Sequence, residues 1–524
     1  MAKRTTKRSS TTRTTKKRTN TRPAAKSPKT TAHPGPTRTE KDTMGEMRVP
    51  QDALYGASTQ RAVENFPVSG RTVPPAVIRA FAALKHACAT VNESLDRLDT
   101  KRANAIRKAC DQIEQGLTEH GGLARHFPVD TFQTGSGTST NMNANEVIAN
   151  LICLAKDAPI GSTKDADYLK RGGVHPNDHV NMGQSSNDTF PTALHIAAAV
   201  EIHTSLIPAL ERMHDQLAAH AKAWDKVVKI GRTHLQDATP IRLGQEFSGY
   251  AQQIAYSIER ATRARDALAE LPIGGTAVGT GINTHPKFGK LVAEQLTNHY
   301  AAANTNKQTG KAALKFREAK NHFEAQHAKD AATEAAALLK TIATSFSKIA
   351  NDIRWLGSGP RCGIGELKLP AVQPGSSIMP GKVNPVICES LIMVATQVVA
   401  NDAAVTISNT GGVGSVLDLN VAMPLIAERL VESIHLLANG ADMFTDKLLA
   451  GLEPDHERCA ELIEGSLAMC TSLVPAIGYD KSAAIAYEAF NTGKTVRQIA
   501  LEQAVLPEKE LNQLLNPMKM TKPS

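Results

Sequence analysis

An eleven-residue segment, Gly375–Pro385, carries the side chains best suited to acid–base chemistry beside a carboxylate. Its glycine and proline residues predict a loop that can move. Lys382 and Asn384 supply a cation and an amide donor, the pair needed to hold a carboxylate. Ser376 and Ser377 precede that cation, and a serine close to a fixed positive charge can act as a base because its alkoxide is stabilised. An ordinary surface loop is the alternative, and the length and order of the segment disfavour it.

Two further polar clusters offer hydroxyl and amide donors. Thr134–Asn145 combines Ser, Thr and Asn with glycine, which suits a loop that converges on an anion, although such a loop alone also fits a helix cap. His175–Asp188 contains two histidines and two aspartates. A metal site is disfavoured there because the His-x-x-x-His pattern lies at a proline-broken segment, with no helix to align both imidazoles. Ser185, Ser186 and Asn187 instead form a second set of neutral donors just before a helix.

The remaining two clusters contain a histidine and a glycine-rich run. In Gly231–Glu246, Thr233 and His234 are expected where one helix ends and the next begins. A histidine there can titrate near neutrality and exchange a proton with water. Gly274–Pro286 is rich in glycine, but no strand is expected before it, so the pattern does not predict nucleotide binding. Polar loops between helices are common, so each cluster alone is a weak signal.

Long helices must position these clusters. Between residues 335 and 356 apolar side chains recur every three or four positions, a single stripe of about six turns. Comparable runs cover 190–221, where Pro208 predicts a kink, and 243–271, 392–408 and 425–449. Strand-like alternation is scarce, and residues 47–61 are expected to be ordered but not helical. These lengths predict an elongated helical bundle, and the shorter pattern after residue 450 predicts a small helical C-terminal domain.

In order and spacing the five clusters, together with Gly359–Glu366, resemble the fumarase/aspartase superfamily from about Arg48 to the C-terminus. Members add or eliminate water, ammonia or a nitrogen base across the double bond of fumarate. Within the superfamily the chain resembles class II fumarases. Those enzymes carry Thr-His where aspartases typically carry Gln in place of His, and the chain has Thr233 and His234. They also carry Gln-Ser-Ser-Asn-Asp, as in Gln184–Asp188.

The resemblance implies a role for each matching residue. Ser376 would be the base that takes the C3 proton of malate, and His234, oriented by Glu389, would activate or protonate the water. Lys382 and Asn384 would hold a substrate carboxylate. The other residues implied for the dicarboxylate pocket are Ser136, Gly137, Thr138, Ser185, Ser186, Asn187, Thr233, Ser377 and Val383. The run His175, Pro176, Asn177 and Asp178 resembles an accessory dicarboxylate site of the family.

The resemblance further implies a mainly α, three-domain fold in which the long bundles of four identical chains form a homotetramer core and share active sites. The expected divisions are a disordered basic tail (1–43), an N-terminal domain (44–183), a central long-helix bundle domain (184–450) and a small helical C-terminal domain (451–524). No metal or organic cofactor is implied, and the reaction belongs to the tricarboxylic acid cycle. Ser139, Thr140 and Gly183 depart from the usual family residues and concern only fine pocket shape.

Composition separates a tail from a near-neutral body. Residues 1–42 carry 13 Lys and Arg against two acids, so the remaining 47 Lys and Arg face 49 acids. A tail with almost no large apolar residue predicts disorder, and its clustered cations leave weak polyanion binding open beside an incidental role. It lacks the apolar face of a mitochondrial transit peptide and the apolar core of a secretory signal. No run of 18 apolar residues predicts a membrane span, and seven scattered cysteines favour the cytoplasm.

Three rival interpretations remain at this point. Aspartase or another fumarate-releasing lyase is disfavoured by His234 and by the Ser185–Ser186 pair. A catalytically silent homologue would have lost the base or the His–Glu pair, whereas Ser376, His234 and Glu389 are all present. A protein that acts chiefly as a polyanion binder through its tail would show salt-dependent nucleic-acid binding that is lost on truncation.

Overall fold

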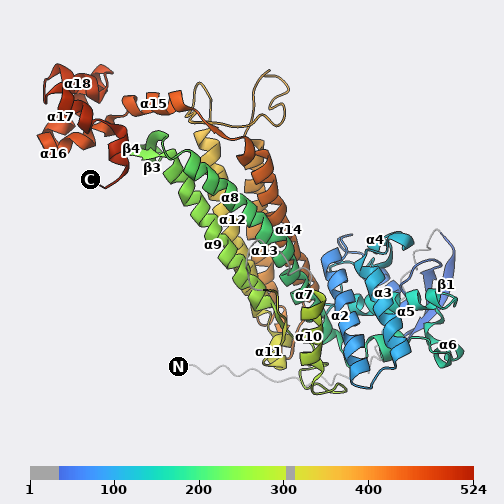
Figure 1. The fold of residues 1–524 in the computed structure, drawn as a ribbon. Helices are drawn as coiled ribbons and strands as arrows, with labels where there is room; N and C mark the ends of the chain where they lie inside the picture. The colour runs from blue at the N-terminus through green and yellow to red at the C-terminus, as the bar shows by residue number, and fades with distance from the viewer. Residues whose placement is uncertain (1–34, 302–312, 524) are drawn as a thin grey trace, which may run out of the picture.

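Three regions follow one another along an elongated molecule in the computed structural model, which describes residues 35–301 and 313–523 (Figure 1). A helical N-terminal region lies at one end, a long bundle crosses the middle, and a small C-terminal region lies at the far end. The predicted divisions at 183/184 and 450/451 fall just before α7 (Ser186–Glu201) and inside a short 3-10 turn, η5 (Leu449–Gly451). The mainly α expectation is confirmed. Sheets in the described residues are all two-stranded ribbons.

The bundle is built from the predicted long helices, with small shifts at their ends. Its members are α7, a π-helical segment η4 (Ile202–Leu206), α8 (Ile207–Ala223), α9 (Leu243–Leu268), α12 (Asp330–Leu356), α13 (Val386–Asn409) and α14 (Met423–Lys447). The apolar stripe predicted on α12 faces inward, since Leu339, Phe346 and Ile353 are fully buried. The irregularity expected at Pro208 is the π-helical segment before it. Proline has no N–H to offer the carbonyl four residues earlier, so the regular ladder is interrupted there.

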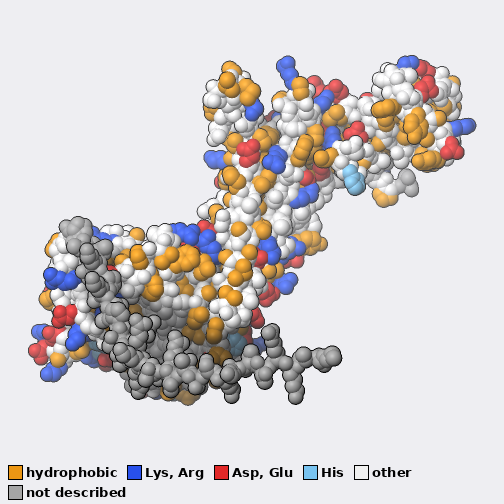
Figure 2. Space-filling model, turned by 180° about the vertical axis from the view of Figure 1, so that it is seen from behind, with side chains coloured by type: hydrophobic (Ala, Val, Ile, Leu, Met, Phe, Trp, Pro, Cys, Tyr) orange, Lys and Arg blue, Asp and Glu red, His pale blue; other side chains and the backbone are white. Residues whose placement is uncertain are grey.

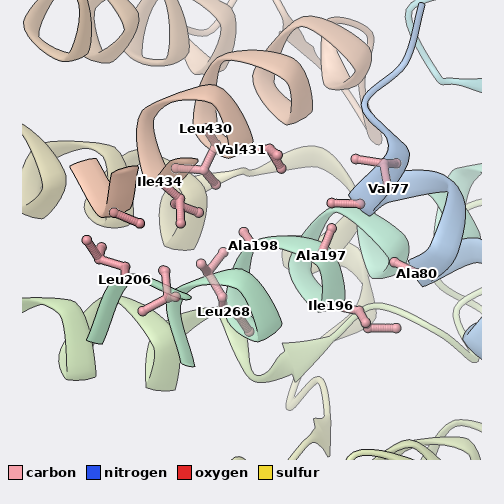
Figure 3. Packing of buried hydrophobic residues seen from close by; sticks show 14 of the residues in the cluster. Val77, Ala80, Ile196, Ala197, Ala198, Leu206, Leu268, Leu430, Val431 and Ile434 are labelled. Carbon is pink, nitrogen blue, oxygen red and sulfur yellow. The ribbon is translucent and has the colours of Figure 1, made fainter. Parts of the chain in front are cut away.

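The N-terminal region is joined to the bundle by a shared hydrophobic core. It contains α1 (Ala57–Asn65), α2 (Pro75–Ser94), α3 (Thr100–Glu114), α4 (Leu123–His126), α5 (Thr138–Ala155) and α6 (Ala166–Lys170). Figure 3 shows Val77 and Ala80 of α2 beside Ala197 of α7, with Leu430 and Ile434 of α14 on the other side. Small residues on α7 allow these helices to approach closely, so the ends of α5 and α7 are held in a fixed relation.

The expected disordered tail ends earlier than predicted. Strand β1 (Thr37–Asp42) pairs with β2 (Gly45–Pro50), and Asp42 accepts two hydrogen bonds of 2.8 Å from Arg61. Arg38 donates to the backbone oxygen of Tyr55 at 2.6 Å. The prediction was wrong for residues 37–43 because it counted apolar residues, whereas backbone pairing and ion pairs hold this ribbon. The rest of the predicted tail, residues 1–34, lies outside the described residues.

Two local expectations also need correction. Residues 57–61, expected not to be helical, open α1, because the buried carboxylate of Glu146 accepts hydrogen bonds from the N–H groups of Gly56, Ser58 and Thr59 at the start of that helix. Between α8 and α9, a hairpin replaces the expected direct passage from helix to helix. Its strands are β3 (Val228–Thr233) and β4 (Gln236–Arg242).

The C-terminal region has its own small core. Its helices are α15 (His456–Gly465), η6 (Leu467–Leu473), α16 (Val474–Ile477), α17 (Tyr479–Thr492), α18 (Val496–Glu502), α19 (Glu508–Leu514) and η7 (Pro517–Thr521). Leu473, Ile485 and Ile499 are buried there together with Ile230 of β3. The hairpin therefore packs against the C-terminal region as well as against the bundle.

Contrary to the expectation that no segment could span a bilayer, two helices within residues 35–301 and 313–523 have the length and the apolar composition needed to cross a membrane. In the α7–α8 helix, 67% of the apolar 18-residue stretch is buried inside the chain, so packing within the bundle explains why this stretch is apolar. In α13 only 33% of the corresponding stretch is buried. Met393, Val399 and Ile407 are among its exposed side chains. Figure 2 shows hydrophobic side chains along the bundle on the face in view.

Candidate active site

One half of the predicted dicarboxylate pocket is assembled within the single chain. Thr138 Oγ1 lies 2.8 Å from Ser136 Oγ and 2.7 Å from Ser186 Oγ, so three predicted hydroxyls form one continuous cluster. Thr138 begins α5 and Ser186 begins α7. The positive ends of two helix dipoles therefore meet at these hydroxyls, an arrangement that favours an anion.

Gly137 allows the two helices to approach this closely. Its φ of 73° is left-handed, and a Cβ added there would lie 2.0 Å from the ring of Phe190 on α7. Any larger residue would push α5 away from α7 and separate Thr138 from Ser186. Gly137 thus shapes the hydroxyl cluster through the backbone.

Ser185 and Asn187 brace this half of the pocket. The Ser185 hydroxyl caps α7 by accepting from the Asn187 N–H at 3.2 Å. The Asn187 amide donates to the backbone oxygen of Ala277 at 2.8 Å, which ties α7 to the glycine-rich cluster. Asp188 is fully buried and accepts from the N–H groups of Ser185 and Thr276. Burial raises the pKa of Asp188 to about 6, although these N–H bonds oppose the shift.

The Gly375–Pro385 loop, which contains Ser376, is held in shape by hydrogen bonds between its own residues. Ser376 Oγ accepts from the N–H groups of Ile378 at 3.2 Å and Met379 at 3.0 Å. These two donors would stabilise an alkoxide on Ser376, a feature that the residue types alone did not indicate. The Asn384 amide donates to the Gly375 oxygen at 2.7 Å, so in the single chain it holds the loop. Ser377, Lys382 and Val383 are exposed.

Thr233 and His234 lie at the tip of the β3–β4 hairpin and are exposed. His234 and Leu235 have φ of 57° and 62°, the left-handed pair that a two-residue hairpin turn requires. The hairpin is anchored close to its tip. Arg232 makes hydrogen bonds of 2.8 and 3.2 Å to the fully buried carboxylate of Glu366.

The clusters divide between the two ends of the bundle. The hydroxyl cluster lies at the end shared with α2 and α5, whereas the hairpin and the segment between α12 and α13 lie at the opposite end (Figure 1). The helix from Ser186 to Ala223 has 38 residues, a length of about 57 Å. Ser376 and Ser186 of one chain therefore cannot hold the same small substrate. No hydrogen bond or ion pair joins His234 to Glu389, which is exposed in the first turn of α13, within the described chain.

The accessory run forms a π-helical turn, η3 (Pro176–Val180). His175 Nδ1 accepts from the N–H groups of Asn177 and Asp178 at 3.3 and 3.1 Å, so this histidine caps the turn. Burial lowers the pKa of His175, which favours the neutral ring. Among residues 35–301 and 313–523, no group of three or more His, Cys, Asp or Glu side chains is arranged to hold a metal ion.

Two protein-family models match separate parts of the chain. A family model described as Lyase matches residues 45–400, and one described as Fumarase C C-terminus matches residues 469–522. "Fumarate hydratase class II" of Corynebacterium glutamicum is 49% identical over 92% of this chain and 96% of its own length. The chain belongs to the class II fumarate hydratase family. The mitochondrial fumarate hydratase of Rhizopus oryzae is 47% identical over 92% of each chain.

Solved structures of the family share the fold. The crystal structure of a class II fumarase from Schistosoma mansoni matches with a TM-score of 0.85 at 36% identity, over 93% of this chain and 99% of that one. A fumarate lyase:delta crystallin structure from Brucella melitensis matches with a TM-score of 0.83 at 40% identity, over 93% of this chain and 100% of that one. Family membership confirms the resemblance derived from the motifs and decides against the aspartase alternative.

The motifs did not indicate two buried charged residues, one on α2 and one on α5. Lys85 and Glu146 are at most 5% exposed and lie outside the Gly375–Pro385 segment. Lys85 had one available signal, a lone lysine within the small apolar run Phe81–Ala89 on α2. Glu146 had none, since a glutamate inside a helix is ordinarily exposed.

Proposed function

We propose that the chain catalyses the reversible hydration of fumarate to L-malate, the reaction of the tricarboxylic acid cycle. The near full-length match to proteins named fumarate hydratase carries this assignment. In the malate-to-fumarate direction, a base takes a proton from C3 and leaves a dianionic aci-carboxylate. The C2 hydroxyl then departs as water from the opposite face, and the double bond forms.

Ser376 is the proposed base. The N–H groups of Ile378 and Met379 point at its oxygen, and Lys382 in the same loop adds positive charge. Both effects favour the alkoxide, and prearranged donors also stabilise the charge that develops on the substrate carboxylate. Lys382 and Asn384, with Ser377 and Val383 beside them, are proposed to hold that carboxylate.

His234 and Glu389 are proposed to act together at the water. A charged Glu389 beside His234 would orient the ring and support a proton on it, so that the leaving hydroxyl is protonated. The cluster of Ser136, Thr138 and Ser186, braced by Gly137, Ser185 and Asn187, completes the dicarboxylate pocket with Thr233. His175, Pro176, Asn177 and Asp178 are proposed as an accessory dicarboxylate site.

The two ends of the bundle are proposed to meet in a homotetramer. The α13 helix is apolar around most of its circumference, yet Met393 and Ile407 are 66% and 58% exposed. A helix of that kind is normally buried on all sides, so α13 fits a core shared with other copies of the chain. Antiparallel packing of bundles would bring the hydroxyl cluster of one chain to the hairpin and loop of others.

We also propose a reducing compartment, the cytoplasm, as the site of action. All seven cysteines are free, and Cys88, Cys110 and Cys153 are among the buried ones. Weak polyanion binding by the basic N-terminal tail is kept as a second, separate role, supported only by its charge.

The reaction is tested with purified protein and either L-malate or L-aspartate as sole substrate, following the ultraviolet absorbance of the fumarate formed. Malate should be dehydrated without added metal, and aspartate should barely react. Comparable release of fumarate from aspartate, or loss of activity with a chelator, would refute the proposal.

The site assignment is tested by single and paired variants. Ser376→Ala should lower turnover by about 10²–10⁴-fold while dicarboxylate binding persists, since the groups that hold the carboxylate remain. His234→Asn and Glu389→Gln should slow the water step, and the double variant should be little worse than the worse single one. Full additivity would refute the His234–Glu389 pair. Near-normal turnover by Ser376→Ala would exclude this serine as the base.

A further inference from the structure

Lys85, on α2, is a completely buried lysine whose hydrogen-bond partners are all side-chain amides. Its exposure is 0%, and its Nζ donates to Asn141 Oδ1 at 2.8 Å, Asn181 Oδ1 at 3.0 Å and Gln184 Oε1 at 2.9 Å. An ammonium group has three protons, and all three are used. Among the described residues no carboxylate forms a salt bridge with it; Asp188 acts on its charge from beyond that range.

The three acceptors belong to the two clusters that build the hydroxyl half of the pocket. Asn141 lies one helical turn after Thr138 on α5, and Gln184 directly precedes Ser185. Asn181 accepts from the Asn141 amide as well, at 3.2 Å. The Lys85 ammonium therefore joins α2, the first turn of α5 and the segment before α7 at a single point.

We propose that Lys85 is a positioning residue for the substrate. Its ammonium fixes Thr138 and Ser186 relative to each other and places a positive charge beneath the pocket that no carboxylate among the described residues contacts directly, since Asp188 acts on it only from a distance. This inference rests on the proposed function, because a dicarboxylate is the ligand whose charge would complete the site. A buried charge that no carboxylate contacts directly costs stability, and a bound dianion would offset part of that cost.

Burial also sets the pH range in which Lys85 carries its charge. It lowers the pKa of Lys85 to about 8. The ionisable groups that face it are Cys88, Cys110 and Asp188. Burial raises the pKa of both thiols, so they stay neutral, while Asp188 titrates near 6. Near neutral pH Lys85 is therefore charged. Above about pH 8, Lys85 is the one among these four groups that loses its proton.

The test replaces Lys85 with Met, which keeps the length and removes the charge and donors. A hydrogen bond to a charged group is worth about 1.5–3 kcal/mol, so we expect the KM for fumarate to rise about 10- to 100-fold. The inhibition constant of succinate, an unreactive dicarboxylate, should rise equally, while kcat falls less than about threefold. A folded Lys85→Met enzyme with unchanged KM and inhibition constant, or with loss confined to kcat, would overturn the proposal.

Lys329→Met is the matched control. Lys329 is 1% exposed, and its Nζ donates to three backbone oxygens, among them those of Gln326 at 3.1 Å and Ala328 at 2.8 Å. Its loss removes a buried ammonium without touching the hydroxyl clusters, so its KM should stay near that of the wild type. A KM rise equal to that of Lys85→Met would show a general effect of losing a buried lysine and would overturn the proposal.

A milder variant guards against misfolding. Gln184→Met removes one acceptor and leaves the lysine, and we expect a smaller rise in KM in the same direction; no rise would count against the proposal. Wild-type enzyme that does not act on fumarate would instead refute the proposed function. Succinate binding, followed by thermal shift in all variants, measures the contribution of Lys85 independently of turnover.

Discussion

Two variants that are each inactive should regain activity when their chains assemble together. Ser376→Ala removes the proposed base, which lies at one end of the bundle, and should cost about 10²–10⁴-fold. Thr138→Val combined with Ser186→Ala removes two hydroxyls from the other end, about 57 Å away along the α7–α8 helix. At about 1.5–3 kcal/mol for each hydrogen bond to a charged ligand, this pair should also cost about 10²–10⁴-fold.

In a random equal mixture of the two variant chains, half of the Gly375–Pro385 loops and half of the hydroxyl clusters are intact. If each site takes the loop from one chain and the cluster from another, about one quarter of the sites are wild type. Co-expressed and co-purified chains should therefore show about one quarter of wild-type turnover in the malate assay, against 1% or less, roughly, for either parent. The control mixes each variant with itself. Activity no greater than the mean of the parents would refute the shared site.

Three further predictions concern the N-terminus and Lys85. Deleting residues 1–34 should leave activity and Tm nearly unchanged. Deleting residues 1–43 also removes β1 with the Arg38 and Asp42 contacts, and should lower Tm by several degrees in a thermal melt. Equal melting temperatures of the two truncated forms would show that β1 does not stabilise the fold. Because burial lowers the pKa of Lys85 to about 8, its charge is lost as pH rises, so wild-type kcat/KM should fall between about pH 7 and 9 more steeply than that of Lys85→Met. Stability should move the other way: between about pH 8 and 10.5 the unfolded chain binds this proton and the folded chain does not, so the free energy of unfolding should rise, measured by urea titration. Parallel pH profiles of the two enzymes would contradict the Lys85 assignment.

The long helices could be predicted from the sequence because their burial is periodic. The α12 stripe at spacings of three and four placed Phe346 and Ile353 correctly in the core. The hairpin could not be predicted. Its turn contains His234 and Leu235 in place of Asn-Gly, and those residues adopt left-handed φ because the flanking strands and Glu366 fix the chain. The β1 strand was missed because pairing and ion pairs, rather than apolar burial, hold it.

The site was predicted as a set of motifs and not as a geometry. The hydroxyls of Ser136, Thr138 and Ser186 do meet, as the composition of their loops indicated. In the proposed homotetramer the position of Ser376 relative to them depends on contacts between chains, and periodicity within one chain carries no information about those. The pairing of His234 with Glu389 stays a prediction for the same reason. Lys85 was missed because a lone lysine in a helix is usually solvated.

The exposed apolar surface of α13 also has a consequence for how the chain is made. If the proposed homotetramer forms, a newly folded copy presents this 24-residue helix to its surroundings before it meets a partner. At that moment association with other copies competes with aggregation and with adsorption to lipid surfaces. The first process depends on encounters between well-folded copies, so slow synthesis at low temperature should raise the yield of active enzyme. Dilution should inactivate it gradually, and its apparent melting temperature should increase with protein concentration.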